Sequence, residues 1–224
     1  MTDTHTHTHF DFAELTAKQR YKLLIGSVIP RPIALVTTVN RNGRANAGPF
    51  SFFNVLTHDP AIVALGIENY DDMQFKDTAR NIRATEEFIV HICDAALVEQ
   101  MEICAIKFGA EINELDEAGL ATVPGVHVAC PRIVAAPVAL ECRRFMGLEI
   151  GPAREIVLGR VVAVHIRNDL VDAKTHHIDQ MGMDAIGRLG GHLYARQLDQ
   201  FEVVTKTVAQ WNNLKTSVKQ EPES

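Results

Sequence analysis

The chain has 224 residues, of which 46% are hydrophobic and 22% are charged, and its formal net charge is -6. These values are typical of a globular protein that can bury a sizeable core, and they leave no basic face for nucleic acid or anionic lipid. The longest apolar runs have the length of strands, so we expect no membrane partner.

The N-terminal stretch, residues 1–20, is polar and rich in histidine. It lacks a basic region followed by an apolar stretch, so we expect it not to be an export signal. His5, His7 and His9 alternate along it, and imidazole nitrogens can bind a divalent metal. These histidines have no cysteine or carboxylate partner at a recognisable spacing, and a short polar terminus is more often disordered, so we predict no metal site.

Six short apolar, β-branched runs predict strands, and turn-rich pieces such as 40–49 and 58–60 separate most of them. This pattern is typical of antiparallel β-structure that closes into a barrel or a sandwich, so we expect a mainly β fold in one domain. The predicted strands are 33–39, 50–56, 61–67, 87–92, 136–145 and 155–166, and helical patterns cover 13–26, 76–86, 94–109 and 178–191.

The stretch PFSFFN, residues 49–54, mixes aromatic and polar side chains within one predicted strand. Because a strand alternates its side chains, Phe50, Phe52 and Asn54 would share one face, and Ser51 and Phe53 the other. Neither face is purely apolar, which indicates a surface that touches something flat and partly polar. The alternative is an ordinary strand with a hydrogen-bonded serine.

The stretch KDTARNI, residues 76–82, places Lys76 and Thr78 at a predicted helix start. Free backbone N–H groups and the positive end of the helix dipole favour a phosphate at this position. In the alternative interpretation, Asp77 or Thr78 caps the helix and Lys76 is only solvated.

The four cysteines, at positions 93, 104, 130 and 142, lack CxxC spacing and the density of a secreted scaffold, so we expect reduced thiols and a cytoplasmic protein. GxGxxG after a strand, GxxxxGK[ST], HExxH and GxSxG are also absent from the sequence. The common signatures of dinucleotide-binding proteins, nucleotide hydrolases, zinc proteases and serine hydrolases are therefore missing.

Four motifs occur in order: IGSVIPRPIALVTT (25–38), GRANAGPFSFFN (43–54), KDTARNI (76–82) and GRLGG followed by Tyr194. In this combination the sequence resembles the flavin reductase-like family of FMN-binding split barrels, from about Tyr21 to Phe201. The resemblance implies a six-stranded antiparallel Greek-key split barrel over 21–205, between an N-terminal extension and a polar C-terminal tail over 206–224. It also implies a homodimer with FMN near the subunit interface.

The resemblance further implies that PFSFFN lies along the isoalloxazine ring, with polar contacts from Ser51 and Asn54 and apolar contact from Phe50 or Phe52. Lys76 and Thr78 would hold the 5'-phosphate. The other FMN contacts that it implies are Arg31, Thr37, Thr38, Asn81, Gly190, Gly191 and Tyr194.

The function implied is that of an FMN-dependent oxidoreductase, passing electrons from NAD(P)H through FMN to free flavin, a metal complex or another acceptor. Two alternatives stay open: an FMN-binding electron-transfer protein without NAD(P)H activity, and a specialised FMN-dependent catabolic enzyme. His176 and His177, which precede GRLGG, are candidate catalytic groups because imidazole titrates near neutral pH. The alternative for these two is a pair of polar loop residues.

Overall fold

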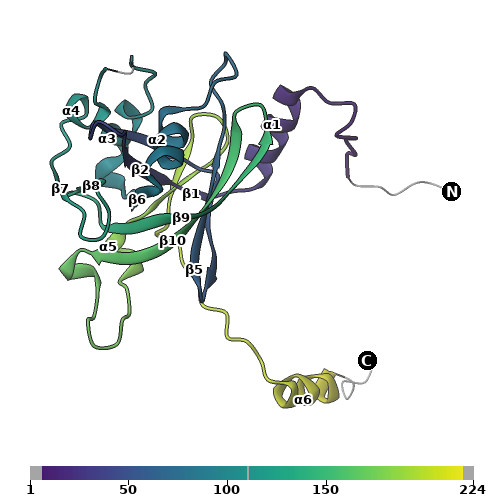
Figure 1. Ribbon diagram of the computed structural model, residues 1–224. Helices are drawn as coiled ribbons and strands as arrows, with labels where there is room; N and C mark the ends of the chain where they lie inside the picture. Colours follow the sequence, from purple (N-terminus) through teal and green to yellow (C-terminus); the bar gives the residue numbers. More distant parts are fainter. Residues whose placement is uncertain (1–6, 110, 219–224) are drawn as a thin grey trace.

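The computed structural model describes residues 7–109 and 111–218, and its centre is a seven-stranded antiparallel sheet. The strand order across this sheet is β3-β2-β6-β9-β10-β5-β4. Figure 1 shows the long neighbouring strands β9 and β10. The strands are β2 (Ala34–Val39), β3 (Ala45–Phe50), β4 (Phe53–His58), β5 (Ala61–Ile67), β6 (Glu87–Ile92), β9 (Val138–Gly151) and β10 (Arg154–Ile166).

The sheet curls into a barrel because its two edge strands, β3 and β4, are consecutive in the chain. Only Ser51 and Phe52 lie between them, so the chain passes directly from one edge of the sheet to the other. At this seam the Phe52 carbonyl accepts a hydrogen bond of 2.7 Å from the Gly66 amide. Bulges between β9 and β10 add local bending and twist. The expected mainly β split barrel is therefore confirmed.

The sheet has seven strands where six were predicted, because the turn-rich stretch ANAGPF forms β3. Proline is tolerated in an edge strand, where its missing N–H group removes no ladder bond from the sheet interior. Pro49 lies opposite Leu35 of β2 in this edge pairing. The prediction of one strand over 50–56 was wrong, since the turn at Ser51 and Phe52 divides that stretch and removes the predicted alternation of its side chains.

Strand β2 is buried along its whole length because it lies between two cores. Ala34 and Val36 point into the barrel and pack with Phe88, whereas Leu35 packs outside the barrel with Met101. Such two-sided burial explains the nearly continuous apolar run IALVTTV.

Short helices and two small sheets surround the barrel. The predicted helix over 178–191 was wrong: only four residues are helical there, which fits the low helix propensity of its glycines. The helices are α1 (Ala17–Ser27), α2 (Asp77–Thr85), η1 (Ala95–Leu97), α3 (Val98–Ile103), α4 (Glu114–Glu117), η2 (Asn168–Leu170), α5 (Gln180–Met183) and α6 (Val208–Val218). The small sheets contain β1 (Arg31–Pro32), β11 (Ile186–Arg188) and β12 (Tyr194–Arg196), and β7 (Thr122–Pro124) and β8 (Pro131–Ile133).

Two classes of feature are absent from residues 7–109 and 111–218. No helix in these ranges is long and apolar enough to cross a membrane. No group of three or more histidine, cysteine or acidic side chains is placed there to hold a metal ion. His5 of the histidine tract lies outside the described residues. All four cysteines are buried as free thiols.

Candidate functional site

Three adjoining cavities of about 140, 220 and 290 Å³ meet at the end of β3, and Pro49 and Phe50 line all of them. We call the combined depression the trough. Lys76 and Thr78 lie at one end, which we call the α2 end. Tyr194 lies at the other end, which we call the hairpin end. Ser51 and Phe52 line the part between them, so the seam of the barrel forms a wall of the trough.

The α2 end presents the start of a helix that no side chain caps. The N-cap residue is Lys76, whose backbone is extended and whose side chain makes no capping hydrogen bond. The Asp77 carboxylate instead accepts a 2.9 Å hydrogen bond from the Tyr70 hydroxyl. The Thr78 hydroxyl accepts one of 3.1 Å from the Asn46 amide. The capping alternative for this segment is thus wrong, and the N–H groups of the first turn lack a side-chain acceptor.

Two lysines supply positive charge at the α2 end. Lys76 is half-buried, with its ammonium 5.7 Å from the centroid of the Phe50 ring. Burial lowers the pKa of the Lys76 ammonium, and the nearby charge of Lys107 lowers it further. Lys107 lines the same cavity and forms a 2.6 Å ion pair with Asp71. An anion bound here would stabilise a partly desolvated cation.

Two carboxylates also line the α2 end, and each is already engaged. Asp77 pairs with Arg80 as well as with Tyr70. The Glu114 carboxyl accepts a 3.1 Å hydrogen bond from the Ala47 amide, and burial raises its pKa.

The hairpin end is a polar cluster built from the β11–β12 hairpin and α3. The Tyr194 hydroxyl contacts both the Arg188 guanidinium and the Glu102 carboxylate. The same guanidinium lies 4.4 Å from the centroid of the Tyr194 ring and donates a 2.7 Å hydrogen bond to the Gly191 carbonyl. The flat Tyr194 ring, with the polar groups of Arg188 and Glu102 beside it, suits a planar ligand with a polar edge.

Arg31 fixes the segments around the trough and is itself buried. Its guanidinium donates to the carbonyls of Ile25 at 2.6 Å, Val28 at 2.9 Å and Leu189 at 3.0 Å. A longer contact of 3.4 Å reaches the Ser51 hydroxyl. Burial lowers the pKa of this guanidinium, which has no carboxylate partner among the described residues. Arg31 therefore ties the end of α1 and the β11–β12 hairpin to the seam.

Three predicted contact residues form buried links instead of lining the trough. The Thr37 hydroxyl donates a 2.6 Å hydrogen bond to the Pro131 carbonyl. The Thr38 hydroxyl accepts one of 3.0 Å from the Asn81 amide, which fastens α2 to β2. The Thr38–Asn81 bond places α2 relative to the barrel, and the Thr37 bond joins β2 to β8.

Asn54, Gly190, Gly191, His176 and His177 do not line the trough either. Asn54 is exposed on β4, where its side chain accepts a 2.8 Å hydrogen bond from the Val55 amide. The two histidines are exposed on the turn between Val171 and Ile178. The trough is also lined by residues that were not predicted, among them Lys107, Arg188, Glu102 and Tyr21.

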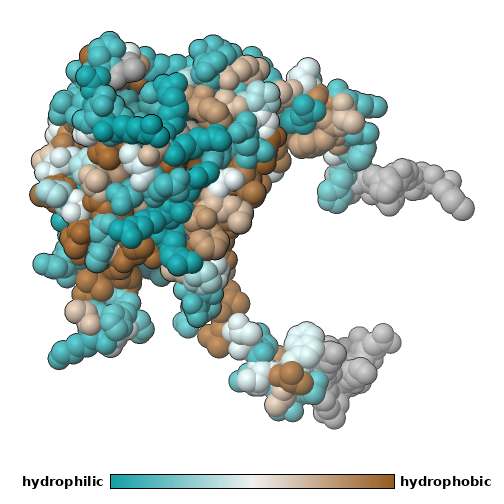
Figure 2. Space-filling view, in the orientation of Figure 1, coloured by the Kyte–Doolittle hydropathy of each residue, from teal (hydrophilic) through white to brown (hydrophobic). Residues whose placement is uncertain are grey.

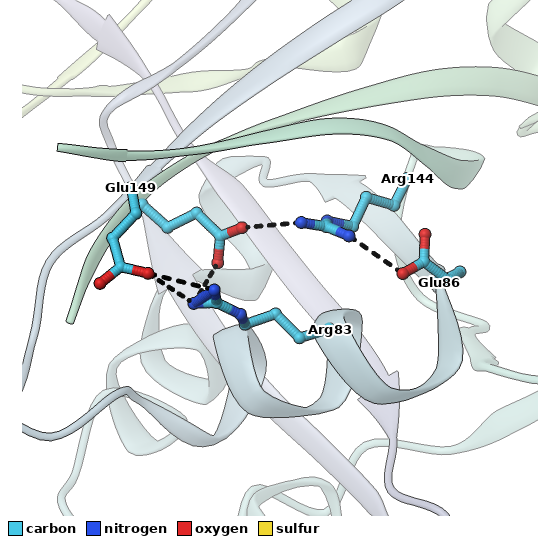
Figure 3. A network of polar contacts seen from close by, with 5 residues as sticks. Arg83, Glu86, Arg144 and Glu149 are labelled. Carbon is cyan, nitrogen blue, oxygen red and sulfur yellow. Dashed lines mark hydrogen bonds and ion pairs between the residues drawn. The ribbon is translucent and has the colours of Figure 1, made fainter.

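An ion network holds α2 against the β9–β10 hairpin (Figure 3). The buried Glu155 carboxylate lies 3.2 Å from the Arg144 guanidinium and 3.7 Å from that of Arg83. Arg83 is in the last turn of α2, and its guanidinium lies 4.3 Å from the centroid of the Phe75 ring. Because Phe75 immediately precedes Lys76, the network fixes the segment that carries the lysine of the α2 end.

Comparisons with known proteins point to one family. A family model, the flavin reductase like domain, matches residues 25–182. A protein of Deinococcus radiodurans is 40% identical over 212 residues, which cover 92% of this chain and 93% of that protein.

Solved structures with the same fold include nitrilotriacetate monooxygenase component B from Bacillus cereus. It has a TM-score of 0.84 and 32% identity, and the match covers 88% of this chain and 98% of that one. The 2-nitrobenzoate 2-nitroreductase of Pseudomonas fluorescens has a TM-score of 0.82 and 35% identity, over 90% of this chain and 98% of that one.

Proposed function

Since the chain belongs to the flavin reductase-like family, we propose that it is an FMN-dependent oxidoreductase that passes electrons from NAD(P)H to free flavin, a metal complex or another acceptor. The observation that carries the proposal is the trough, because its two ends differ in the way that the two ends of FMN differ. An uncapped helix start with two lysines suits a phosphate, and an aromatic and polar cluster suits the ring.

In this proposal the protein binds and orients, and FMN supplies the two-electron chemistry. Lys76 and Thr78 hold the 5'-phosphate, together with the free amides of the first turn of α2. Ser51 and Phe52 lie beside the ring, and Tyr194 contacts it from the hairpin end. Arg31 acts through the segments that it ties together. The domain that does this spans 21–205.

The protein is further proposed to be a cytoplasmic homodimer. The trough is a surface depression whose wall includes Tyr21 of α1, an exposed residue. A single barrel leaves one side of a planar ligand open to water, and a second subunit would cover it.

The direct test mixes the purified protein, FMN and reduced nicotinamide and follows the oxidation of the nicotinamide. Steady oxidation that requires both protein and FMN supports the reductase. Tight FMN binding without nicotinamide oxidation would contradict it and support the electron-transfer alternative.

A second candidate is a specialised enzyme that reduces an organic acceptor. It is favoured by the likeness to the 2-nitrobenzoate 2-nitroreductase, at 35% identity. Adding a nitroaromatic carboxylate to the same mixture discriminates the two: a reduced product formed in proportion to the nicotinamide consumed supports the second candidate. Unchanged nitroaromatic with continued nicotinamide oxidation supports the first.

A further inference from the structure

A second polar cavity, of about 410 Å³, adjoins the α2 end of the trough, and we call it the arginine pocket. It shares Asn46, Asp77 and Glu114 with the cavity that Lys76 and Thr78 line, so the two cavities lie next to each other. Among the described residues, it shares none with the cavities at the seam and the hairpin end. The arginine pocket therefore extends the trough beyond the place proposed for the phosphate.

Two elements bring three arginines to the pocket. Arg41 and Arg44 come from the loop between β2 and β3, and Arg80 comes from α2. Asp77, Arg80 and Ala84 are spaced three and four positions apart on α2, so they share one face of the helix. Figure 2 shows mainly hydrophilic surface over the upper part of the body, where Figure 1 places α2 and α4. The setting of the pocket therefore indicates a polar ligand.

The loop that carries Arg41 and Arg44 is a fixed turn. The Asn40 side chain accepts hydrogen bonds of 2.9 Å from the Asn42 amide and 3.0 Å from the Arg44 amide. The Asn40 carbonyl accepts one of 2.9 Å from the amide of Gly43, whose φ of 78° lies in the left-handed region that glycine favours. Because the backbone is held in place, less conformational freedom is lost when these two arginines bind a ligand.

The charges of the pocket favour an anion, because three arginines and two acidic residues line it. Of the two carboxylates, Asp77 is paired with Arg80 and also accepts from the Tyr70 hydroxyl. Arg41 and Arg44 are exposed at the rim. A guanidinium group binds phosphate through two parallel hydrogen bonds and also stacks on aromatic bases. The pocket therefore suits a phosphate that is joined to a base.

The rest of the lining suits a nucleoside. The Asn46 amide donates to the Thr78 hydroxyl at 3.1 Å and the Asn81 amide to the Thr38 hydroxyl at 3.0 Å, so both amides are held in place. Each amide also carries a carbonyl oxygen, the kind of acceptor that an adenine amino group or a ribose hydroxyl needs. Ile112 adds a partly buried apolar side chain. The pocket's volume of about 410 Å³ is within the range of about 300–1,000 Å³ that is usual for small-molecule sites.

We propose that the arginine pocket binds the adenosine phosphate half of a dinucleotide that also occupies the trough. The source that the geometry favours is flavin adenine dinucleotide (FAD), in which a second phosphate and adenosine are attached to the 5'-phosphate of FMN. The groups of FAD, from ring to first phosphate to second phosphate and adenosine, follow the order of the hairpin end, the α2 end and the arginine pocket. The proposal rests on the proposed function, because it takes the first phosphate to bind at the α2 end.

A reduced nicotinamide dinucleotide carries the same adenosine phosphate and is the other source of this chemistry. Its nicotinamide has to reach the flavin ring, so its adenosine would lie in the arginine pocket while FMN occupies the trough. The two sources differ in the quantity that the arginines control. For FAD it is the affinity for the flavin, and for the nicotinamide dinucleotide it is the KM measured with FMN bound.

The first measurement compares full-length variants by isothermal titration calorimetry with FMN and with FAD. In the double variant Arg41→Ala, Arg44→Ala, the dissociation constant for FAD should rise at least ~10-fold, because two charged donors to the second phosphate are lost. The dissociation constant for FMN should change less than ~2-fold, since FMN does not reach the pocket. The matched control, Arg143→Ala with Arg167→Ala, removes two arginines that line neither the pocket nor the trough and should bind both flavins like the wild type.

The KM for reduced nicotinamide, measured with FMN on the same variants, identifies the source. Weaker FAD binding with an unchanged KM assigns the pocket to FAD. A raised KM with the FAD affinity of the control assigns it to the nicotinamide dinucleotide. FAD affinity and KM that both equal those of the control, or an equal loss of FMN and FAD affinity, would overturn the proposal. Wild-type protein that shows the FAD effect but oxidises no reduced nicotinamide would count against the proposed function only.

Discussion

Replacing Glu155 by glutamine tests how far the ion network of Figure 3 positions the α2 end of the trough. The substitution keeps the shape and one acceptor oxygen but removes the negative charge between two guanidinium groups. Removing one partner of a buried ion pair typically costs about 3–5 kcal/mol. Here both arginines keep a second carboxylate near the surface, with Arg83 3.1 Å from Glu149 and Arg144 3.0 Å from Glu86. We therefore expect the free energy of unfolding to fall by about 2 kcal/mol.

The effect on binding separates positioning from stability. Because Arg83 holds the turn before Lys76, the Glu155→Gln protein that remains folded should bind FMN about tenfold more weakly, a loss of about 1.4 kcal/mol. Riboflavin, which lacks the phosphate, should bind as it does to the wild type. Urea unfolding gives the stability, and flavin fluorescence titrations give the two affinities.

The matched control is Glu149→Gln, which removes the exposed member of the same network. It should change stability by less than about 0.5 kcal/mol and leave FMN affinity unchanged. An equal loss of FMN and riboflavin affinity in the Glu155→Gln protein would show that the network supports the fold without positioning the lysine. Wild-type stability in that variant would refute the energetic argument itself.

Two further predictions concern the seam and His91, a buried residue of β6 whose ring contacts the Leu35 carbonyl and the Ile133 amide. Ser51→Ala should weaken FMN binding by about 0.5–1.5 kcal/mol. Asn54→Ala should leave FMN affinity unchanged, because the Asn54 side chain accepts from the Val55 amide and does not line the trough. Equal effects in fluorescence titrations would contradict the placement of the trough. Burial lowers the pKa of His91 to about 4, below its value of 6.5 in the unfolded chain. The unfolded chain therefore binds a proton at this residue before the folded protein does. As the pH falls from about 6.5 toward 4, the free energy of unfolding should fall by about 3 kcal/mol. His91→Gln should flatten that part of the stability curve in urea unfolding at several pH values, and an unchanged slope would refute the assignment.

Most of the barrel could be predicted because its strands are local apolar runs. Strands β5 and β6 have the predicted bounds, and β2 agrees to within one residue. Strand β3 was not predicted because asparagine, glycine and proline favour turns and alanine is depleted in strands. Its pairing with β2 makes this stretch extended. Local propensity was overridden there by tertiary structure.

The α2 end of the trough could be predicted because Lys76 and Thr78 are two residues apart at a helix start. The hairpin end could be predicted only in part. Glu102 and Arg188 meet Tyr194 through contacts that span up to 92 positions in the chain, and no local pattern marks such a cluster. Arg31 was predicted as a ligand contact, and its bond to the Leu189 carbonyl, which spans 158 positions, could not be predicted from local sequence.

The central claim, that the trough binds FMN with its phosphate at the start of α2, is tested most directly by the Lys76→Ala variant with two ligands. Affinities of the wild type and the variant for FMN and for riboflavin complete a thermodynamic cycle. If the Lys76 ammonium binds the phosphate, the variant should lose about 1.5–3 kcal/mol of FMN affinity and none of its riboflavin affinity. Wild-type protein that binds the two flavins equally well, or a variant that loses both alike, would contradict the account.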